Sequence, residues 1–152
     1  METPAPEDWT RPAAYARRTL PRLVRAPEDF SGRMTLFTLR RMGGHGLHDA
    51  HAANLMLDTF GLPFRRPLVL LRAVMLELSR MTVRPIKLAP CCCGRMTPDE
   101  ARLLAVLRHG DSDPARAGRH LARLAGHAAL PVLSAAAAYG AALADLGKGL
   151  RR

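Results

Sequence analysis

The chain is organised around residues 90–100, which read Pro90-Cys91-Cys92-Cys93-Gly94-Arg95-Met96-Thr97-Pro98-Asp99-Glu100. This stretch holds every cysteine of the protein and ends in a strong helix start. Thr97 can act as an N-cap, Pro98 suits the first helical position, and Glu100 can complete a capping box with Thr97. The carboxylates of Asp99 and Glu100 also stabilise the positive end of a helix dipole. We therefore expect a helix to begin at residue 98.

Adjacent cysteines are poorly placed for a structural disulfide. Consecutive Cα atoms lie about 3.8 Å apart, below the usual disulfide range of roughly 4.4–6.8 Å. A bond between neighbours would be strained and easily reduced. Arg95 and the helix dipole would favour thiolate, so Cys91, Cys92 and Cys93 are predicted to form a labile redox site or to bind a soft metal ion. The alternative is that they are small packing residues without a chemical role.

Two histidines supply a second group of possible metal ligands. His48 and His51 share a face if their helix begins before Asp49, and with Cys91 and Cys93 they would offer nitrogen and sulfur ligands to zinc. The alternative is that the histidines are loop residues and that Asp49 is the N-cap of the helix. The cysteine run lacks the C-x2-C spacing that marks zinc sites, and both interpretations stay open.

The periodicity of apolar residues predicts an all-α protein. The chain has 152 residues, which suits one domain, and no long stretch alternates with period two. Helices are expected from Phe30 to the glycines at 43–46, over 49–60, 68–81 and 98–110, from Asp113-Pro114 to about 128, and from Pro131 to about 146. Residues 83–90, bracketed by prolines, are expected to be extended. The predicted fold is a single-domain bundle of about five or six helices.

The third helix, over residues 68–81, is apolar on most sides and is therefore expected in the middle of the bundle. Leu71, Met75 and Leu78 are its predicted core residues. Residues 128–144 carry no charge, but they are mostly alanine and are interrupted by Pro131, so we expect no membrane span.

Residues 1–29 form a basic arm ahead of the predicted domain at 30–152. Five prolines exclude a long helix there, and its composition predicts partial disorder. The N-terminus has no apolar signal region, and a clustered odd number of cysteines is not a secreted disulfide framework. These features favour a cytoplasmic protein.

A formal net charge of +10 points to an acidic protein or nucleic acid as partner. The candidate phosphate contacts are Arg17, Arg18 and Arg22 in the arm and Arg116, Arg119 and Arg123 on one helix. The alternative for the helix is a solvated charged face. The chain carries no helix-turn-helix, zinc-finger or RNA-binding signature.

Four short sequence segments resemble those of a known family: Leu39-Arg40-Arg41-Met42, Asp49-Ala50-His51-Ala52-Ala53, Arg66-Pro67-Leu68-Val69-Leu70-Leu71 and Pro90-Cys91-Cys92-Cys93-Gly94-Arg95-Met96-Thr97. Over about residues 34–107 they resemble an uncharacterised bacterial family, a domain of unknown function whose members are small Arg/Ala-rich proteins. The resemblance implies no activity, ligand or partner.

These patterns together predict a small helical interaction or regulatory module with a cysteine cluster that senses thiol redox state or binds a soft metal such as zinc. The alternative is a basic protein associated with nucleic acid. An enzyme is the less favoured interpretation, because the sequence contains no nucleophile elbow, Walker loop or H-E-x-x-H motif.

Overall fold

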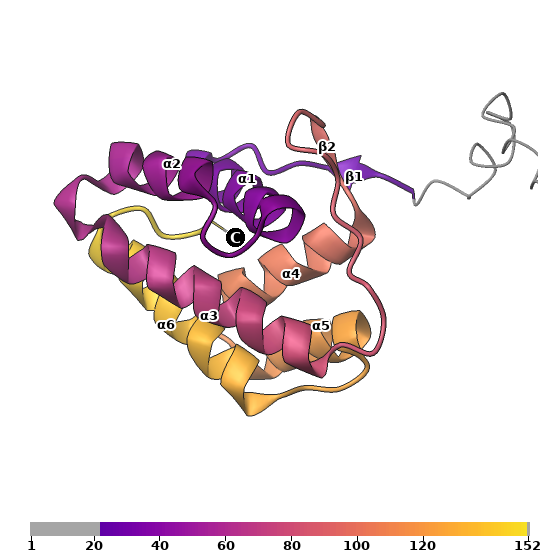
Figure 1. Cartoon of the computed structure of the whole chain (residues 1–152). Coiled ribbons are helices and arrows are strands. Elements are labelled where there is room, and N and C mark those ends of the chain that lie inside the picture. Colours follow the sequence, from indigo (N-terminus) through magenta and orange to yellow (C-terminus); the bar gives the residue numbers. More distant parts are fainter. Residues whose placement is uncertain (1–21, 152) are drawn as a thin grey trace, which may run out of the picture.

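The computed structural model of the chain describes residues 22–151. Six α-helices make up most of this region and confirm the predicted all-α class (Figure 1). In chain order they are α1 (Phe30–His45), α2 (Ala50–Phe60), α3 (Arg65–Met81), α4 (Pro98–His109), α5 (Pro114–Ala125) and α6 (Leu130–Asp145). A short 3-10 turn, Leu62–Phe64, leads into α3, and two short strands, β1 (Val24–Arg25) and β2 (Arg95–Met96), complete the fold.

The start of α4 is the predicted one. Thr97 is the N-cap, Pro98 is the first helical residue, and both hydrogen bonds of the capping box form. The Glu100 backbone N–H donates to the Thr97 hydroxyl at 3.1 Å, and the Thr97 backbone N–H donates to the Glu100 carboxylate at 2.7 Å. This end of α4 is buried, because Thr97, Asp99 and Glu100 are all nearly inaccessible to solvent.

Helix α1 ends within the predicted glycine segment 43–46: it continues to His45 and is capped by Gly46, which has a φ of 101°. Helix α3 begins at Arg65 rather than residue 68, since the preceding 3-10 turn already sets its direction. Pro67 is therefore the third residue of α3, where its missing N–H still costs no intrahelical hydrogen bond.

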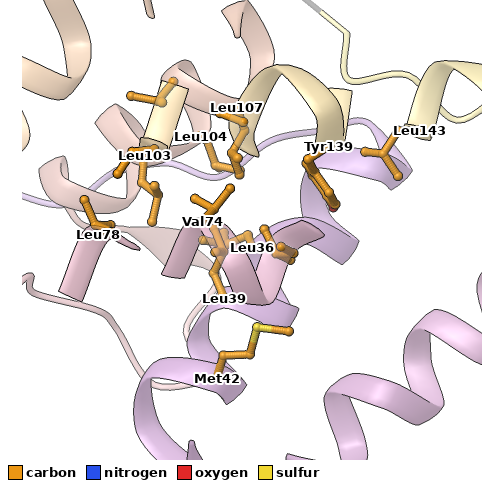
Figure 2. Close-up of a cluster of buried hydrophobic side chains, with 14 of the residues drawn as sticks. Leu36, Leu39, Met42, Val74, Leu78, Leu103, Leu104, Leu107, Tyr139 and Leu143 are labelled. Carbon is orange, nitrogen blue, oxygen red and sulfur yellow. The ribbon is translucent and has the colours of Figure 1, made fainter. Parts of the chain in front are cut away.

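The core is mostly aliphatic and contains residues from all six helices. Figure 2 shows its side chains from α1, α3, α4 and α6. Leu71 and Leu78 are buried as predicted, but Met75 is only partly buried, and Val74 takes its place. Helix α3 packs against α6 on one side and against α1 and α2 on another (Figure 1). It is not enclosed on every side, because Val69 is 57% exposed.

One hydroxyl pair crosses this core. The side-chain oxygens of Thr35 on α1 and Tyr139 on α6 are 2.8 Å apart and share a hydrogen bond. Tyr139 is fully buried, and burial raises the pKa of its phenol above the usual range. The pair gives a polar group in the apolar interior its partner.

The cysteine stretch is joined to the N-terminal region by the two strands. Val24 pairs with Met96 and Arg25 with Arg95 in an antiparallel ribbon (Figure 1). The predicted arm therefore touches the helical domain from residue 24 onward. Residues 83 and 84 form a bend, and residues 85–90 belong to no helix or strand. Within residues 22–151, no helix has both the length and the apolar character that crossing a membrane requires.

Candidate functional site

The cysteines lie in a loop between residues 89 and 97 that turns back on itself. The backbone N–H of Cys93 donates to the Pro90 carbonyl at 3.0 Å and closes the turn. All three thiols are free. Cys92 is exposed, whereas Cys91 and Cys93 are half-buried. The turn therefore presents one thiol to solvent and places two along its inner side.

A buried ion pair stands behind this loop. Arg40 on α1 donates from Nε to Glu100 Oε1 at 2.8 Å and from Nη2 to Oε2 at 3.0 Å. Their side chains are only 3% and 0% exposed. Burial alone would lower the pKa of Arg40, but the hydrogen bond and charge of Glu100 outweigh it and raise that pKa. The pair stays ionised because each charge has its counter-charge at contact distance.

The same pair fastens both ends of the cysteine loop. Arg40 donates from Nη1 to the Cys93 carbonyl at 2.7 Å and from Nη2 to the Arg95 carbonyl at 2.6 Å. Glu100 accepts the Ala89 backbone N–H at 2.8 Å in addition to the N–H of Thr97. The loop is thus tied at residues 89, 93, 95 and 97 to one buried pair.

A second ion pair anchors the segment that leads into the loop. Arg84 donates to both oxygens of Asp99 at 2.9 Å, and Asp99 also accepts the Lys87 backbone N–H at 3.0 Å. The hydrogen bond from Arg84 lowers the pKa of the Asp99 carboxyl group. The Thr97 hydroxyl donates to the Lys87 carbonyl at 2.6 Å. The start of α4 therefore organises residues 84–97 through the side chains of Asp99, Glu100 and the N-cap Thr97.

A third pair lies on the other side of the cysteines. Arg41 contacts Asp49 at 2.6 Å and donates to Nδ1 of His51 at 3.1 Å. The hydrogen bond from Arg41 holds the pKa of Asp49 well below its usual range. The raised pKa of Arg41 is due first to Asp49 and in smaller part to Cys91, which lies close to the guanidinium. Cys91 therefore faces a fixed positive charge.

Two open cavities flank the loop. One of about 770 Å³ lies between the β1–α1 segment, α1 and the loop, and Cys91 and Cys93 line it together with Arg40. The other, of about 600 Å³, is lined by Cys91 and Cys92 together with Arg41 and His45. Cys91 lines both cavities. Small reactants therefore have access to the thiols from two sides.

The predicted zinc ligands are only partly brought together. Helix α2 begins at Ala50 with Asp49 as its N-cap, so His48 precedes the helix and the shared face with His51 does not form. His51 and Cys91 do come to the same side of the molecule, but the residue that each approaches is the cationic Arg41. Within residues 22–151 no three His, Cys, Asp or Glu side chains gather in a way that could hold a metal ion.

Two cations, Arg40 and Arg41, lie beside the cysteine loop, and the sequence assigned neither of them a role there. The side chain of Arg95, the predicted thiol-activating residue, is exposed, and it is the Arg95 carbonyl that turns inward to Arg40. One signal was present: Arg40 lies next to Leu39 on the buried face of an apolar helix, where a charge requires a partner. The sequence did not indicate that Glu100 is that partner.

The predicted phosphate contacts on α5 lie away from the cysteine loop (Figure 1). Arg116, Arg119 and Arg123 are exposed on α5, and Arg22 is exposed ahead of β1. Arg17 and Arg18 lie outside the described residues. The structure therefore separates the cysteine loop from the basic helix face, and the two features call for separate functional explanations.

Comparison with known proteins bears out the resemblance seen in the sequence. Neither the curated proteins nor the solved structures gave a match. A model of a family of unknown function, DUF6628, matches residues 19–152, which is nearly the whole chain and more than the resemblance covered. The match begins ahead of β1 and includes all six helices, the cysteine loop and the three ion pairs around it. The chain therefore belongs to the family of unknown function DUF6628.

Proposed function

We propose that the protein is a small, non-enzymatic regulatory module whose cysteine loop acts as a thiol-based redox element. The observation that carries this proposal is the placement of Cys91, Cys92 and Cys93 in one turn, free, bordering two open cavities and close to two guanidinium groups. Positive charge near a cysteine favours the thiolate, which is the reactive form. A predicted cytoplasmic location would keep the resting thiols reduced.

The proposed chemistry uses a hydroperoxide as oxidant. A cysteine thiolate attacks the peroxide, takes one oxygen atom to become a sulfenic acid, and releases an alkoxide or hydroxide that is then protonated. A second thiol attacks that sulfur, the sulfenic hydroxyl leaves as water, and a disulfide forms. Since bonds between neighbours in the turn are strained, the second thiol comes from a small-molecule thiol or from another protein chain. Cys92 is the most accessible starting point.

The arrangement also supports a regulatory consequence. Cys93 contributes its carbonyl to Arg40, and Arg40 belongs to the buried pair that positions α4 against α1. A modification that shifts the Cys93 backbone would therefore disturb the buried Arg40–Glu100 pair, whereas a modification at Cys92 would change only the surface. Such a coupling needs no catalytic turnover, because the modification itself is the signal.

Native-state alkylation tests the proposal. The full chain is treated with iodoacetamide at neutral pH, and the labelling rate of each cysteine is followed by peptide mass spectrometry. At least one thiol should react faster than free cysteine, and Arg41→Gln should slow Cys91 in particular. Arg95→Gln is the matched variant, because it removes an exposed charge from the same loop. Slower labelling in this variant would support the thiol-activating role predicted for Arg95. Labelling of all three thiols more slowly than free cysteine would exclude the redox element.

The zinc interpretation stays a prediction that the same preparation checks. Elemental analysis of protein purified without a histidine tag measures bound metal directly. About one zinc per chain, lost in a Cys91→Ala/Cys93→Ala variant, would replace the redox proposal by a metal site. A zinc content near zero together with fast alkylation would leave the redox element as the function of the loop.

A further inference from the structure

Helix α5 presents an arginine face to solvent on the side of the molecule formed with α4. Arg116, Arg119 and Arg123 are spaced by three and four residues and are all exposed, whereas Leu121 and Leu124 on the opposite side are buried. The helix itself, Pro114–Ala125, contains no acidic residue. The result is a strongly amphipathic helix whose outer side carries only positive charge.

These charges have no internal counter-ions in the described part of the chain. The ion pairs there use arginines on β1, α1, α3, α4 and the loop before β2, and none uses an arginine of α5. Asp113, at the N-cap of α5, accepts the Arg116 backbone N–H rather than its guanidinium. No carboxylate within residues 22–151 therefore forms an ion pair with any of the three guanidinium groups.

A pair of stacked histidines lies between α4 and α5, within the positive potential of this face. The rings of His109 on α4 and His120 on α5 lie 6.0 Å apart between centroids, with their planes at 9°. The pKa of each is lowered, first by burial and next by Arg116. Both histidines are therefore predominantly neutral near pH 7, and adding a proton to either one is opposed by the arginines around it.

The charges facing this histidine pair come from several elements and are mostly positive. They are Arg102 and Arg108 on α4, Arg116, Arg119 and Arg123 on α5, and Asp113 at the N-cap. The charged residue of α6, Asp145, pairs with Arg66 of α3 instead, and Arg84 of the loop before β2 pairs with Asp99. Among the charged groups that act most strongly on the histidine pair, Asp113 is the only anion.

The surface composition favours nucleic acid over a protein partner. Among the described residues, the large apolar side chains that are exposed lie on α1, α2, α3, the start of α6 and the loops, not on α4 or α5. Protein interfaces have an apolar core, whereas interfaces with nucleic acid are polar and strongly positive. Arg116 and Arg123 are seven residues apart, which spans about 10 Å of helix. One strand of a duplex presents about three phosphates over that length.

We propose that the α4–α5 face binds the phosphate backbone of double-stranded nucleic acid, without reading its sequence, and that the stacked histidine pair makes this binding stronger in mild acid. Bound phosphates cancel the positive potential and so raise the pKa of both histidines. Binding then takes up protons, and affinity increases as the pH falls below the ordinary histidine value of 6.5. This inference concerns a surface separate from the cysteine loop and does not depend on the thiol chemistry.

The test is fluorescence anisotropy of the full chain with a labelled duplex of about 20 base pairs and mixed sequence. The variant R116Q/R119Q/R123Q should weaken binding at least about ten-fold at 50 mM salt and make the plot of log affinity against log salt shallower by about 2.5–3. The matched control is R33Q/R65Q/R95Q, which removes the same charge from exposed arginines on α1, α3 and β2. It should change affinity by less than about three-fold.

The pH dependence gives a second readout. Duplex affinity of the parent chain should rise between about pH 7.5 and pH 5.5, and H109Q/H120Q should flatten this rise. Equal losses in the two triple-arginine variants, or no binding at low salt, would overturn the proposal. Polyglutamate that competes as well as duplex, charge for charge, would also overturn it, because the face would then recognise acidic protein.

Discussion

Replacing Glu100 by Gln should be among the most damaging conservative changes in this protein. Glu100 is fully buried and accepts four hydrogen bonds, two from Arg40 and one each from the backbone N–H groups of Ala89 and Thr97. A glutamine has nearly the same shape but offers one acceptor oxygen, and its amide N–H₂ would face donors. It also leaves the buried guanidinium without a counter-charge.

The magnitude follows from that loss. Removing one partner of a buried ion pair costs about 3–5 kcal/mol, because the remaining charge is desolvated and unpaired. A typical domain is stable by about 5–15 kcal/mol, so the change should remove a large fraction of the free energy of unfolding. The matched control is Glu77→Gln, which breaks a surface pair with Arg80 whose side chains are 30% and 64% exposed. It should cost less than about 1 kcal/mol.

Urea unfolding followed by circular dichroism measures both variants. The urea midpoint of Glu100→Gln should fall clearly, while the slope of the free energy of unfolding against urea concentration stays unchanged. The double variant R40M/E100M should lose less free energy of unfolding than the losses of R40M and E100M added together. The reason is that no charge is left unpaired in the double variant. A loss below about 1 kcal/mol for Glu100→Gln would show that the pair does not organise this end of α4.

Three further predictions concern the core, the histidines and a close helix approach. Leu71→Ala should lower the free energy of unfolding by about 2–5 kcal/mol, measured by urea unfolding. The pKa values of His109 and His120 are lowered in the folded state, so the unfolded chain binds protons at a higher pH than the folded chain does. The melting temperature should therefore fall as the pH drops below the ordinary histidine value of 6.5, and H109Q/H120Q should make this fall smaller. Gly110→Ala should cost about 1–3 kcal/mol, because its Cβ would lie 2.8 Å from α6 backbone atoms, whereas Gly44→Ala, with nothing within 4 Å, should not destabilise.

Local signals in the sequence predicted the parts of the fold that depend on neighbouring residues. The cap at Thr97 and the N-cap at Asp49 were readable because each involves hydrogen bonds between residues only three apart. The core position of Met75 was wrong for a related reason: helical periodicity places Met75 and Val74 on adjoining lines, and only the packing against other helices decides between them.

The buried pair could not be predicted in the same way. Arg40 and Glu100 are 60 residues apart in the chain, and no spacing rule relates them. The pairing of Val24 with Met96 was missed because two-residue strands have no periodicity to detect. The sequence thus directed attention to the cysteine stretch, whose functional role stays a prediction, while the arginines fixed beside it come from a part of α1 that the sequence alone could not bring near.

The connection between Cys93 and the core makes a last prediction that separates two positions in one turn. The Cys93 carbonyl accepts a hydrogen bond from the buried Arg40, whereas Cys92 is exposed. An adduct that displaces the backbone at Cys93 would leave a charged donor unsatisfied, at a cost of about 1–3 kcal/mol. Two variants, each keeping one of these cysteines and carrying alanine at the other two positions, are converted to the glutathione disulfide and unfolded in urea. The adduct at Cys93 should lower the midpoint and the adduct at Cys92 should not, because only the former moves a group that the core holds. Equal midpoints for the two adducts would mean that chemistry at the loop does not reach the helices, and the cysteines would then act through the surface alone.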